Sequence, residues 1–383
     1  MIHRFVDLFD EPVALVEPDI VFLAQEASPF SFFSLWKAGN LATPERFDTT
    51  IISSLNSTSD FLADPELSPD GTQVVYCRAG SNTTPRQNRI YVVDWNDTAT
   101  TQILSESGGL VLSLQPTWKP DGSQILYRGK GASTSLTLIK VCDPDGTNVT
   151  TLYTQASGLS VFNPTYNHDG SKIGWIEQTS STFPFLARIR VMDSDGSNVS
   201  TVFACSGDED IGVVNGVPAI AWAHSSNTIA FRYRADTAFT TDTEWRKVNS
   251  DGTGLTTLHT VSRAGYGPTD VDPYPITWSW LRDDSSIITT LQTRTDPSPN
   301  HYLAYIAADG SGASFPVVKA SPGGSPDFRP VVFANRIYFG TASPLTQLSS
   351  VDLSGGDERV DFDGTAFSPT VTFHGFRGDT INI

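Results

Sequence analysis

Positively charged residues, cysteines and long apolar runs are all scarce in this sequence. Its 383 residues include only 25 Lys and Arg against 42 Asp and Glu, which gives a formal net charge of −17. Because a surface this acidic repels phosphate backbones and anionic lipid, we expect neither a nucleic acid partner nor membrane insertion. No run of about eighteen apolar residues is present, so no helical membrane span is predicted either.

Three cysteines, Cys77, Cys142 and Cys205, are too few and too scattered for a disulfide framework. None has the spacing of a zinc site, and Cys77 and Cys142 lie in predicted strands, so we expect buried free thiols there. Acidic residues at positions 7, 10 and 11 interrupt the region where the apolar core of a signal peptide would lie. The sequence therefore predicts no cleaved leader, and a cytoplasmic location or exit by a route that needs no leader.

What the sequence does contain is a short phrase that recurs about every fifty residues, Ser-Pro-Asp-Gly or a weaker version of it. The copies lie at 67–71, 118–122 and 166–170, with weaker ones at 222–226 and 280–284. An apolar strand ending on a bulky side chain follows the first four copies. Self-similarity at this period predicts an array of identical supersecondary units.

Each unit contains four predicted strands. In the unit from 116 to 163 they lie at 117–118, 125–128, 136–142 and 149–153, separated by a Pro-Asp-Gly turn, a loop and an Asp-Pro-Asp-Gly turn. The third strand recurs at 90–94, 189–193, 244–249, 302–307 and 348–353. Because one four-stranded sheet cannot bury both faces alone, radial stacking of such sheets is expected, which is an all-β propeller.

Six prolines open full units, at positions 65, 116, 164, 218, 275 and 330. The segments 19–22, 33–37 and 45–47 match the last three strands of a further unit, and 366–369 mimics its missing first strand. A shared N- and C-terminal blade would close the ring and leave no open edge. We therefore favour seven blades, with six and irregular ends as the alternative, and divide the chain into an arm (1–18), one propeller (19–372) and a tail (373–383).

The phrase Leu-Ser-Pro-Asp-Gly at 67–71, with IYVVDWN at 90–96 and IRVMDSDGSNVSTV at 189–202, resembles the TolB-type propeller repeat. That repeat is a relative of the WD repeat, and prolyl oligopeptidases also use it. The resemblance runs from about residue 19 to 369 and implies the propeller fold. Unlike in TolB, we expect neither an exported leader nor an N-terminal α/β domain, and unlike in prolyl oligopeptidases we expect no hydrolase domain.

No residue is predicted to be catalytic, to bind a cofactor or to bind a metal. The segments starting at Asp143 and Asp193 resemble calcium loops, but no bidentate Glu follows either, so hairpin turns are favoured. The six histidines are dispersed, and His168 and His224 occupy turns where exposure is expected. The tryptophans at one repeated position, Trp118, Trp222 and Trp280, are predicted to pack between blades.

The long loops of the predicted meander all emerge on the face opposite the tight turns. Long loops on a rigid scaffold are where binding residues concentrate. The loops of 205–300 carry acidic and tyrosine side chains that suit protein recognition, with plain solvated loops as the alternative. These candidate partner-binding residues are Asp208, Glu209, Asp210, Tyr266, Asp270, Asp272 and Tyr274.

We therefore predict a non-enzymatic propeller that binds other proteins as a subunit of a large assembly. TolB-like propellers also occur among bacteriophage tail genes, so the resemblance implies a virion component, such as a minor tail or tail-tip protein, in the virion or the cytoplasm. One alternative is a stand-alone propeller that binds carbohydrate or another small ligand. A propeller hydrolase or lyase is the other.

Overall fold

The structure is a computed structural model that describes residues 20–26, 32–38, 45–46, 65–79, 88–95, 100–102, 110–131, 137–155, 159–179, 187–207, 209–211, 220–235, 242–261, 278–293, 300–319, 331–333, 336–341, 347–357, 359–363 and 371–376. All regular elements in these ranges are β-strands, and none of the ranges holds a helix capable of crossing a membrane. The predicted all-β class is confirmed. Residues 1–18, the predicted arm, lie outside the described part.

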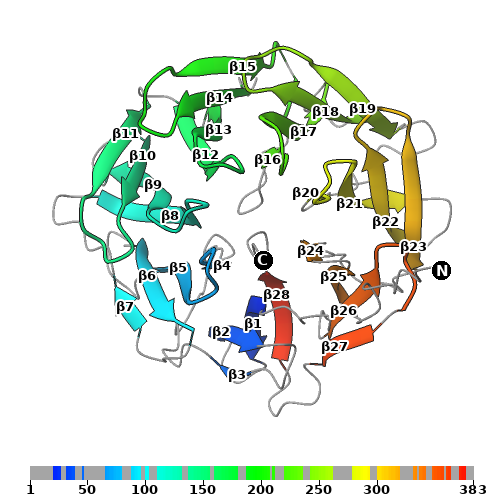
Figure 1. The fold of residues 1–383 in the computed structure, drawn as a ribbon, viewed down its shortest axis with the longest axis horizontal. Helices are drawn as coiled ribbons and strands as arrows, with labels where there is room; N and C mark the ends of the chain where they lie inside the picture. Colours follow the sequence, from blue (N-terminus) through cyan, green and yellow to red (C-terminus); the bar gives the residue numbers. More distant parts are fainter. Residues whose placement is uncertain are drawn as a thin grey trace, which may run out of the picture.

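Four-stranded antiparallel sets of strands stand around a common axis (Figure 1), as radial stacking requires. The innermost strands are β4 (Glu66–Leu67), β8 (Leu110–Trp118), β12 (Leu159–Tyr166), β16 (Ile220–Trp222), β20 (Trp278–Trp280), β24 (Val331–Phe333) and β28 (Val371–Phe376). The second strands are β1 (Ile20–Glu26), β5 (Gln73–Ala79), β9 (Ile125–Gly131), β13 (Lys172–Thr179), β17 (Thr228–Arg234), β21 (Ser286–Thr293) and β25 (Arg336–Thr341).

The remaining strands lie farther from the axis. The third strands are β2 (Phe32–Ala38), β6 (Asn88–Asp94), β10 (Thr137–Cys142), β14 (Ala187–Asp193), β18 (Thr243–Asn249), β22 (Asn300–Ala307) and β26 (Gln347–Asp352). The outermost are β3 (Glu45–Arg46), β7 (Thr100–Gln102), β11 (Thr150–Thr154), β15 (Ser200–Ala204), β19 (Thr256–Val261), β23 (Ala313–Lys319) and β27 (Arg359–Asp363). The predicted third strands begin within two residues of the observed ones.

Hydrogen bonding groups these strands into five four-stranded sheets and one eight-stranded sheet. The eight-stranded sheet holds the sets β4–β7 and β8–β11, which one parallel pair, Asn88 with Leu112, joins. Counted as four-strand sets the described strands make seven units, and counted as hydrogen-bonded sheets they make six.

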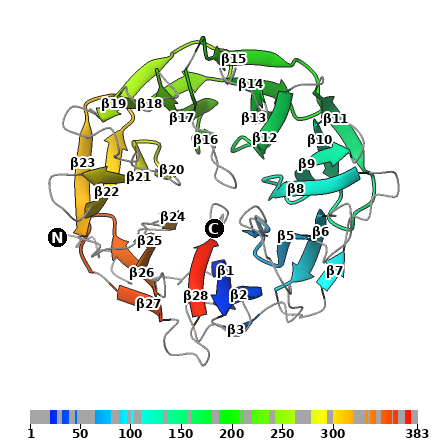
Figure 2. The ribbon, with the colours of Figure 1, turned by 180° about the vertical axis from the view of Figure 1, so that it is seen from behind.

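The two ends of the described chain meet in one sheet, as the sequence predicts. Strand β28 pairs antiparallel with β1, with Phe22 opposite Phe376 and Gln25 opposite Thr372. Figures 1 and 2 both show β28 beside β1. The closing strand comes slightly later than the predicted 366–369, which lies outside the described residues. This pairing satisfies a backbone edge that would otherwise be open.

Tryptophan at the end of the inner strand joins neighbouring sheets, which confirms its predicted packing role. The indole nitrogens of Trp118, Trp222 and Trp280 donate to the carbonyl oxygens of Glu66, Thr165 and Ala221, at 3.1, 3.3 and 3.0 Å. Each acceptor lies one residue before the matching aromatic or leucine position of the preceding unit. All three tryptophans are at most 9% exposed. One residue type at one position therefore supplies both apolar burial and a directional bond at each of these boundaries.

Tyrosine takes the tryptophan position in the β12–β15 sheet. The Tyr166 hydroxyl is buried and has no hydrogen-bond partner among the described residues. Burial, with a smaller contribution from the charge of Asp121, raises the pKa of this phenol above its ordinary value. This boundary therefore lacks the bond that the indoles make elsewhere.

The tight turns share one hydrogen-bond pattern, in which an aspartate oxygen accepts from the backbone N–H two residues later. The donor and acceptor pairs are Thr72 and Asp70, Ser123 and Asp121, Ser171 and Asp169, Thr147 and Asp145, Ser197 and Asp195, and Ser285 and Asp283. The Gly146 N–H closes its turn on the Asp143 carbonyl at 2.9 Å. The hairpin interpretation of the calcium-like segments is therefore confirmed.

Replacement of Gly196 by Ala should destabilise the fold more than replacement of Gly71 by Ala. Both residues have positive φ, 88° and 71°, so both variants lose about 1–2 kcal/mol to the left-handed conformation. A Cβ on Gly196 would also lie 2.9 Å from the Leu152 carbonyl oxygen in the preceding sheet, whereas one on Gly71 meets nothing within 4 Å. Thermal unfolding of both variants checks this; equal losses would show that close packing at Gly196 has no energetic weight.

Tyr166→Phe should leave stability unchanged or raise it, because it removes a buried hydroxyl that makes no hydrogen bond. Trp222→Phe removes a bonded indole N–H and should lower the free energy of unfolding by at least about 1 kcal/mol. Urea unfolding of the two variants provides the comparison. A clear loss of stability in Tyr166→Phe would contradict this account of the boundary.

Candidate functional site

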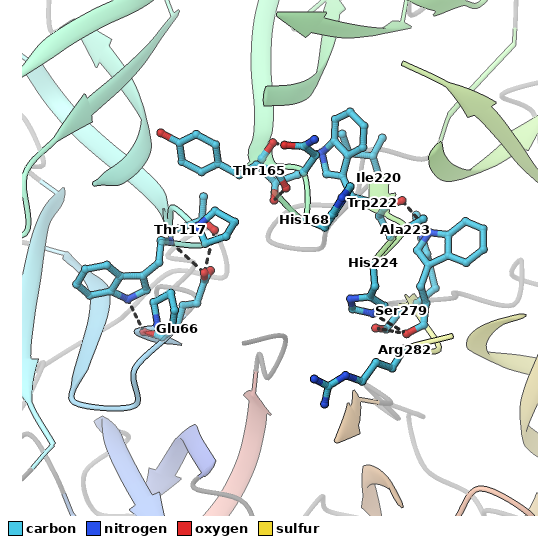
Figure 3. A pocket seen from close by; sticks show the side chains of 18 residues that line it. Glu66, Thr117, Thr165, His168, Ile220, Trp222, Ala223, His224, Ser279 and Arg282 are labelled. Atoms are coloured by element: carbon cyan, nitrogen blue, oxygen red, sulfur yellow. Dashed lines mark hydrogen bonds between the residues drawn. The ribbon is translucent and has the colours of Figure 1, made fainter. Parts of the chain in front are cut away.

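A cavity of about 330 Å³ lies near the axis, on the face that carries the first tight turn of each unit, here called the turn face. The inner strands and first turns of four hydrogen-bonded sheets form its walls (Figure 3). The lining residues are Glu66, Pro69, Thr117, Trp118, Pro120, Thr165, Tyr166, Asn167, His168, Ile220, Ala221, Trp222, Ala223, His224, Trp278, Ser279, Trp280 and Arg282.

Five of these lining residues occupy one equivalent position of the repeated turn. They are Pro69, Pro120, His168, His224 and Arg282, each the second residue of its turn. The five positions are equivalent in structure as well as in sequence. In each turn the first residue donates its backbone N–H to the carbonyl of the residue five positions after it. Proline suits this position because its φ is preset for the turn. In three consecutive sheets a basic or titratable side chain replaces it.

Two residues of the next sheet hold His224. Its backbone N–H donates to Asp284 Oδ1 at 2.6 Å, and its ring Nε2 lies 3.2 Å from the carbonyl oxygen of Trp280. A carbonyl only accepts, so Nε2 must carry the proton in this contact. Nδ1 is then the nitrogen of the neutral ring that can take a proton.

His168 contributes an unsatisfied nitrogen to the cavity wall. Its Nδ1 is buried and has no hydrogen-bond partner in the described part of the chain, while Nε2 lies 4.0 Å from Asp169 Oδ2. A buried polar atom without a partner is destabilising, and a bound molecule that reaches it removes that penalty. His168 thus lines the cavity with a ring whose Nδ1 is shielded from solvent and makes no hydrogen bond to the described residues.

The carboxylate of Glu66, in contrast, is committed to packing. It is 4% exposed and its Oε1 accepts from Thr117 Oγ1 at 2.9 Å and from the Trp118 N–H at 3.0 Å. Figure 3 shows Glu66 and Thr117 on one side of the cavity, with His224 and Arg282 on the other.

The cavity thus differs in charge from the rest of the molecule. Arg282 is exposed and carries a fixed positive charge, and it shares the wall with two imidazoles in a chain of net charge −17. A guanidinium binds a carboxylate through two parallel hydrogen bonds, and imidazoles exchange protons near neutral pH. The arrangement can bind an anion and move protons beside it.

Only two of the predicted partner-binding residues, Glu209 and Asp210, are described, and neither lines this cavity. Glu209 accepts from the Ser206 N–H at 2.7 Å. Asp210 is 9% exposed and its Oδ2 lies 2.6 Å from Arg234, whose backbone it also pairs with. Asp210 is therefore held against β17, and its predicted role in partner binding stays a prediction.

The other five candidates, Asp208, Tyr266, Asp270, Asp272 and Tyr274, lie outside the described residues. Protein binding by the long-loop face stays a prediction for them. His168, His224 and Arg282 were not predicted as one set from the sequence, because each lies in a turn that only weakly matches the Ser-Pro-Asp-Gly repeat. The signal that could have found them was the loss of proline at one repeat position in three consecutive units.

No family model matches the chain, and no curated protein matches it in sequence. Solved structures do match it in fold. An oligogalacturonate lyase in complex with manganese is 11% identical, with a TM-score of 0.59 over 91% of this chain and 85% of that one. An oligogalacturonate lyase from Vibrio parahaemolyticus is 9% identical, with a TM-score of 0.58 over the same shares.

Two further structures bear on the predicted fold. The β-propeller domain of the Trilobed protease from Pyrococcus furiosus is 14% identical, with a TM-score of 0.56 over 90% of this chain and 94% of that one. TolB from Acinetobacter baumannii is 18% identical, with a TM-score of 0.48 over 77% of this chain and 62% of that one. At these identities the likeness to the Trilobed protease propeller and to the two lyases shows the propeller fold alone.

The predicted function is corrected by these comparisons. The expectation of a non-enzymatic subunit of a phage virion is wrong, because the fold is shared with two lyases and nothing in the comparisons points to a phage tail. The prediction that no residue is catalytic rested on the absence of known motifs, and it stays a prediction. Acid–base groups gathered from separate units of a ring have no such motif.

The manganese of the lyase complex does not fit the described residues of this cavity. They offer two imidazoles and the bonded carboxylate of Glu66, and the described part of the chain contains no group of three or more His, Cys, Asp or Glu that could hold a metal ion. Manganese prefers oxygen and imidazole ligands in larger number. We therefore derive no step through a metal.

His168→Pro should preserve or raise thermal stability. It restores the residue found at Pro69 and Pro120, and proline at a compatible turn position stabilises by about 0.4–1 kcal/mol through the unfolded chain. It also removes the unsatisfied imidazole nitrogen. Differential scanning calorimetry of the variant tests this; a melting temperature several degrees below that of the parent would show that the imidazole serves the fold.

Proposed function

We propose that this propeller is an enzyme that cleaves an acidic oligosaccharide, of the uronic acid class, by β-elimination in the turn-face cavity. The observation that carries the proposal is the replacement of the turn proline by His168, His224 and Arg282 in three consecutive sheets that line one cavity. A position under no demand other than the turn would keep proline or another neutral turn residue.

The first element of the proposal is anion binding. Arg282 would hold the sugar carboxylate through its planar guanidinium, which is always charged. Withdrawal of charge at that carboxylate makes the hydrogen on the adjacent ring carbon more acidic, because the carbanion that forms is stabilised. This step calls for a fixed cation, which a second histidine could not supply at neutral pH.

The second element is a pair of proton-transfer groups. Nδ1 of His224, left free by the Nε2 contact to Trp280, would remove the proton from the carbon next to the carboxylate. The electron pair forms a double bond between this carbon and the β-carbon of the same ring, and the bond from that β-carbon to the glycosidic oxygen breaks. His168 would then protonate the departing oxygen, so the reaction consumes no water and needs no oxidant.

The similarity of fold to two lyases is compatible with the proposal, but the proposal rests on the residues of this cavity. Two oligogalacturonate lyases share this architecture over 91% of the chain, so the scaffold is compatible with such chemistry. The residues of the mechanism are taken from this chain alone. The alternative of simple carbohydrate binding uses the same cavity and differs in predicting an intact ligand.

The direct test is incubation of the purified chain with oligogalacturonate and with other uronic acid oligomers, alongside a neutral oligosaccharide. We expect ultraviolet absorbance from the new double bond and products whose summed mass equals that of the substrate. His224→Ala should reduce kcat by about 10²–10⁴-fold, the usual contribution of a general base. Arg282→Ala should raise KM as well as lower kcat.

Lys172→Ala is the matched control, since it also removes one positive charge. Lys172 pairs with Asp193 at 2.9 Å and does not line the cavity, so activity should persist. Recovery of every uronic acid oligomer intact, from folded protein, would sink the lyase proposal. Products that have gained a water molecule would identify a hydrolase instead.

A further inference from the structure

We infer that Asp284 is a positioning residue for His224, a carboxylate that one sheet supplies to the turn of its neighbour. The inference rests on the proposed function for its significance, and on the hydrogen bonds of two adjacent turns for its geometry. Asp284 lies outside the cavity lining, so it would act through His224 rather than on the substrate.

The ordinary turn of this repeat supplies its own carboxylate. Asp70, Asp121, Asp169 and Asp283 each accept the N–H two residues later in the same turn. The turn that carries His224 has Ser225 at this position, so it lacks a carboxylate of its own.

Asp284 of the next sheet reaches this turn. Its Oδ1 accepts the His224 N–H at 2.6 Å, and its Oδ2 accepts from the backbone N–H and the hydroxyl of Ser225 at 2.8 and 2.5 Å. Charge-assisted bonds of this kind are short and strong. The turn that has Ser225 in place of aspartate therefore uses the carboxylate of Asp284 from the neighbouring sheet.

The position of Asp284 is itself a departure from the repeat. It stands where Gly71, Gly122 and Gly170 stand, and it has a φ of 56°. Its N–H closes the turn on the Leu281 carbonyl as the glycine N–H does in the other turns. Aspartate tolerates this left-handed conformation better than most non-glycine residues, so Asp284 can take the glycine position while its carboxylate reaches the neighbouring turn.

The consequence is that the turn with Arg282 and the turn with His224 are tied together. The same sheet holds both the backbone of His224, through Asp284, and its ring, through Trp280. Hydrogen bonds across this boundary therefore hold the backbone and the ring of His224 relative to the turn that carries Arg282. Misplacement of a catalytic group by about 1 Å can reduce rate a hundredfold.

The test is the double variant Ser225→Asp/Asp284→Gly, which returns both turns to the pattern of their neighbours. Each turn then has its own carboxylate and a glycine in the left-handed position, so thermal stability should match the parent within a few degrees. We expect kcat to fall about tenfold to a hundredfold while KM changes less. Full activity in this variant would show that Asp284 only caps a turn, and would overturn the inference.

A second readout works even if no lyase substrate is found. Long-range proton–nitrogen NMR of the imidazoles should show His224 fixed as the Nε2–H tautomer in the parent and averaged between tautomers in the double variant. The His168 signals should stay unchanged and serve as the internal control. Unaltered His224 signals would refute positioning, whereas altered signals in a protein without activity would refute the proposed lyase function alone.

Asp284→Asn, which keeps an acceptor oxygen, should fall between parent and double variant in both readouts.

Discussion

Apolar burial between neighbouring sheets is the interaction on which this architecture depends, and at three boundaries an indole also donates a hydrogen bond to a carbonyl of the preceding sheet. Each sheet presents an apolar face to its neighbour, and burial alone would allow the sheets to slide. The bonds from Trp118, Trp222 and Trp280 are directional, so they fix the height and the angle at which successive inner strands meet. Because the first turns extend directly from these strands, the same bonds set where the turn side chains converge.

That constraint explains how a repeated structure becomes a specific site. Similar units place equivalent residues around the axis, and the cavity is lined by those of consecutive units on one part of the ring. Proline at the turn position serves only the turn, whereas His168, His224 and Arg282 bring two imidazoles and a guanidinium to the cavity wall while the turn keeps its backbone hydrogen bond. The repeated plan of the unit stabilises the fold, and the proposed chemistry uses side chains that depart from that plan on the cavity wall.

Much of the fold was predictable because its signals are local and repeat. Alternating strands, Asp-Gly turns and the tryptophan position each appear in several units, so chance agreement is small. The pairing of β28 with β1 also followed, since an unpaired edge would be costly. The candidate site was harder to predict from the sequence. His168 and Arg282 lie more than a hundred residues apart, and their turns match the repeat only weakly. The ion pair of Asp210 with Arg234 was not predictable for a related reason, because the two residues become neighbours only in the folded sheet.

The sequence by itself determined the unit: four strands, two tight turns and an aromatic at the boundary, because each depends on residues within about ten positions of one another. It also determined the acidic surface, which is a sum over composition. Only the tertiary structure decided which departures from the repeat meet. The ring brings the imidazoles of 168 and 224 and the guanidinium of 282 to one cavity, and it lets a carboxylate at 284 replace the one missing at 225. Proximity across sheet boundaries arises from packing, and no local pattern encodes it.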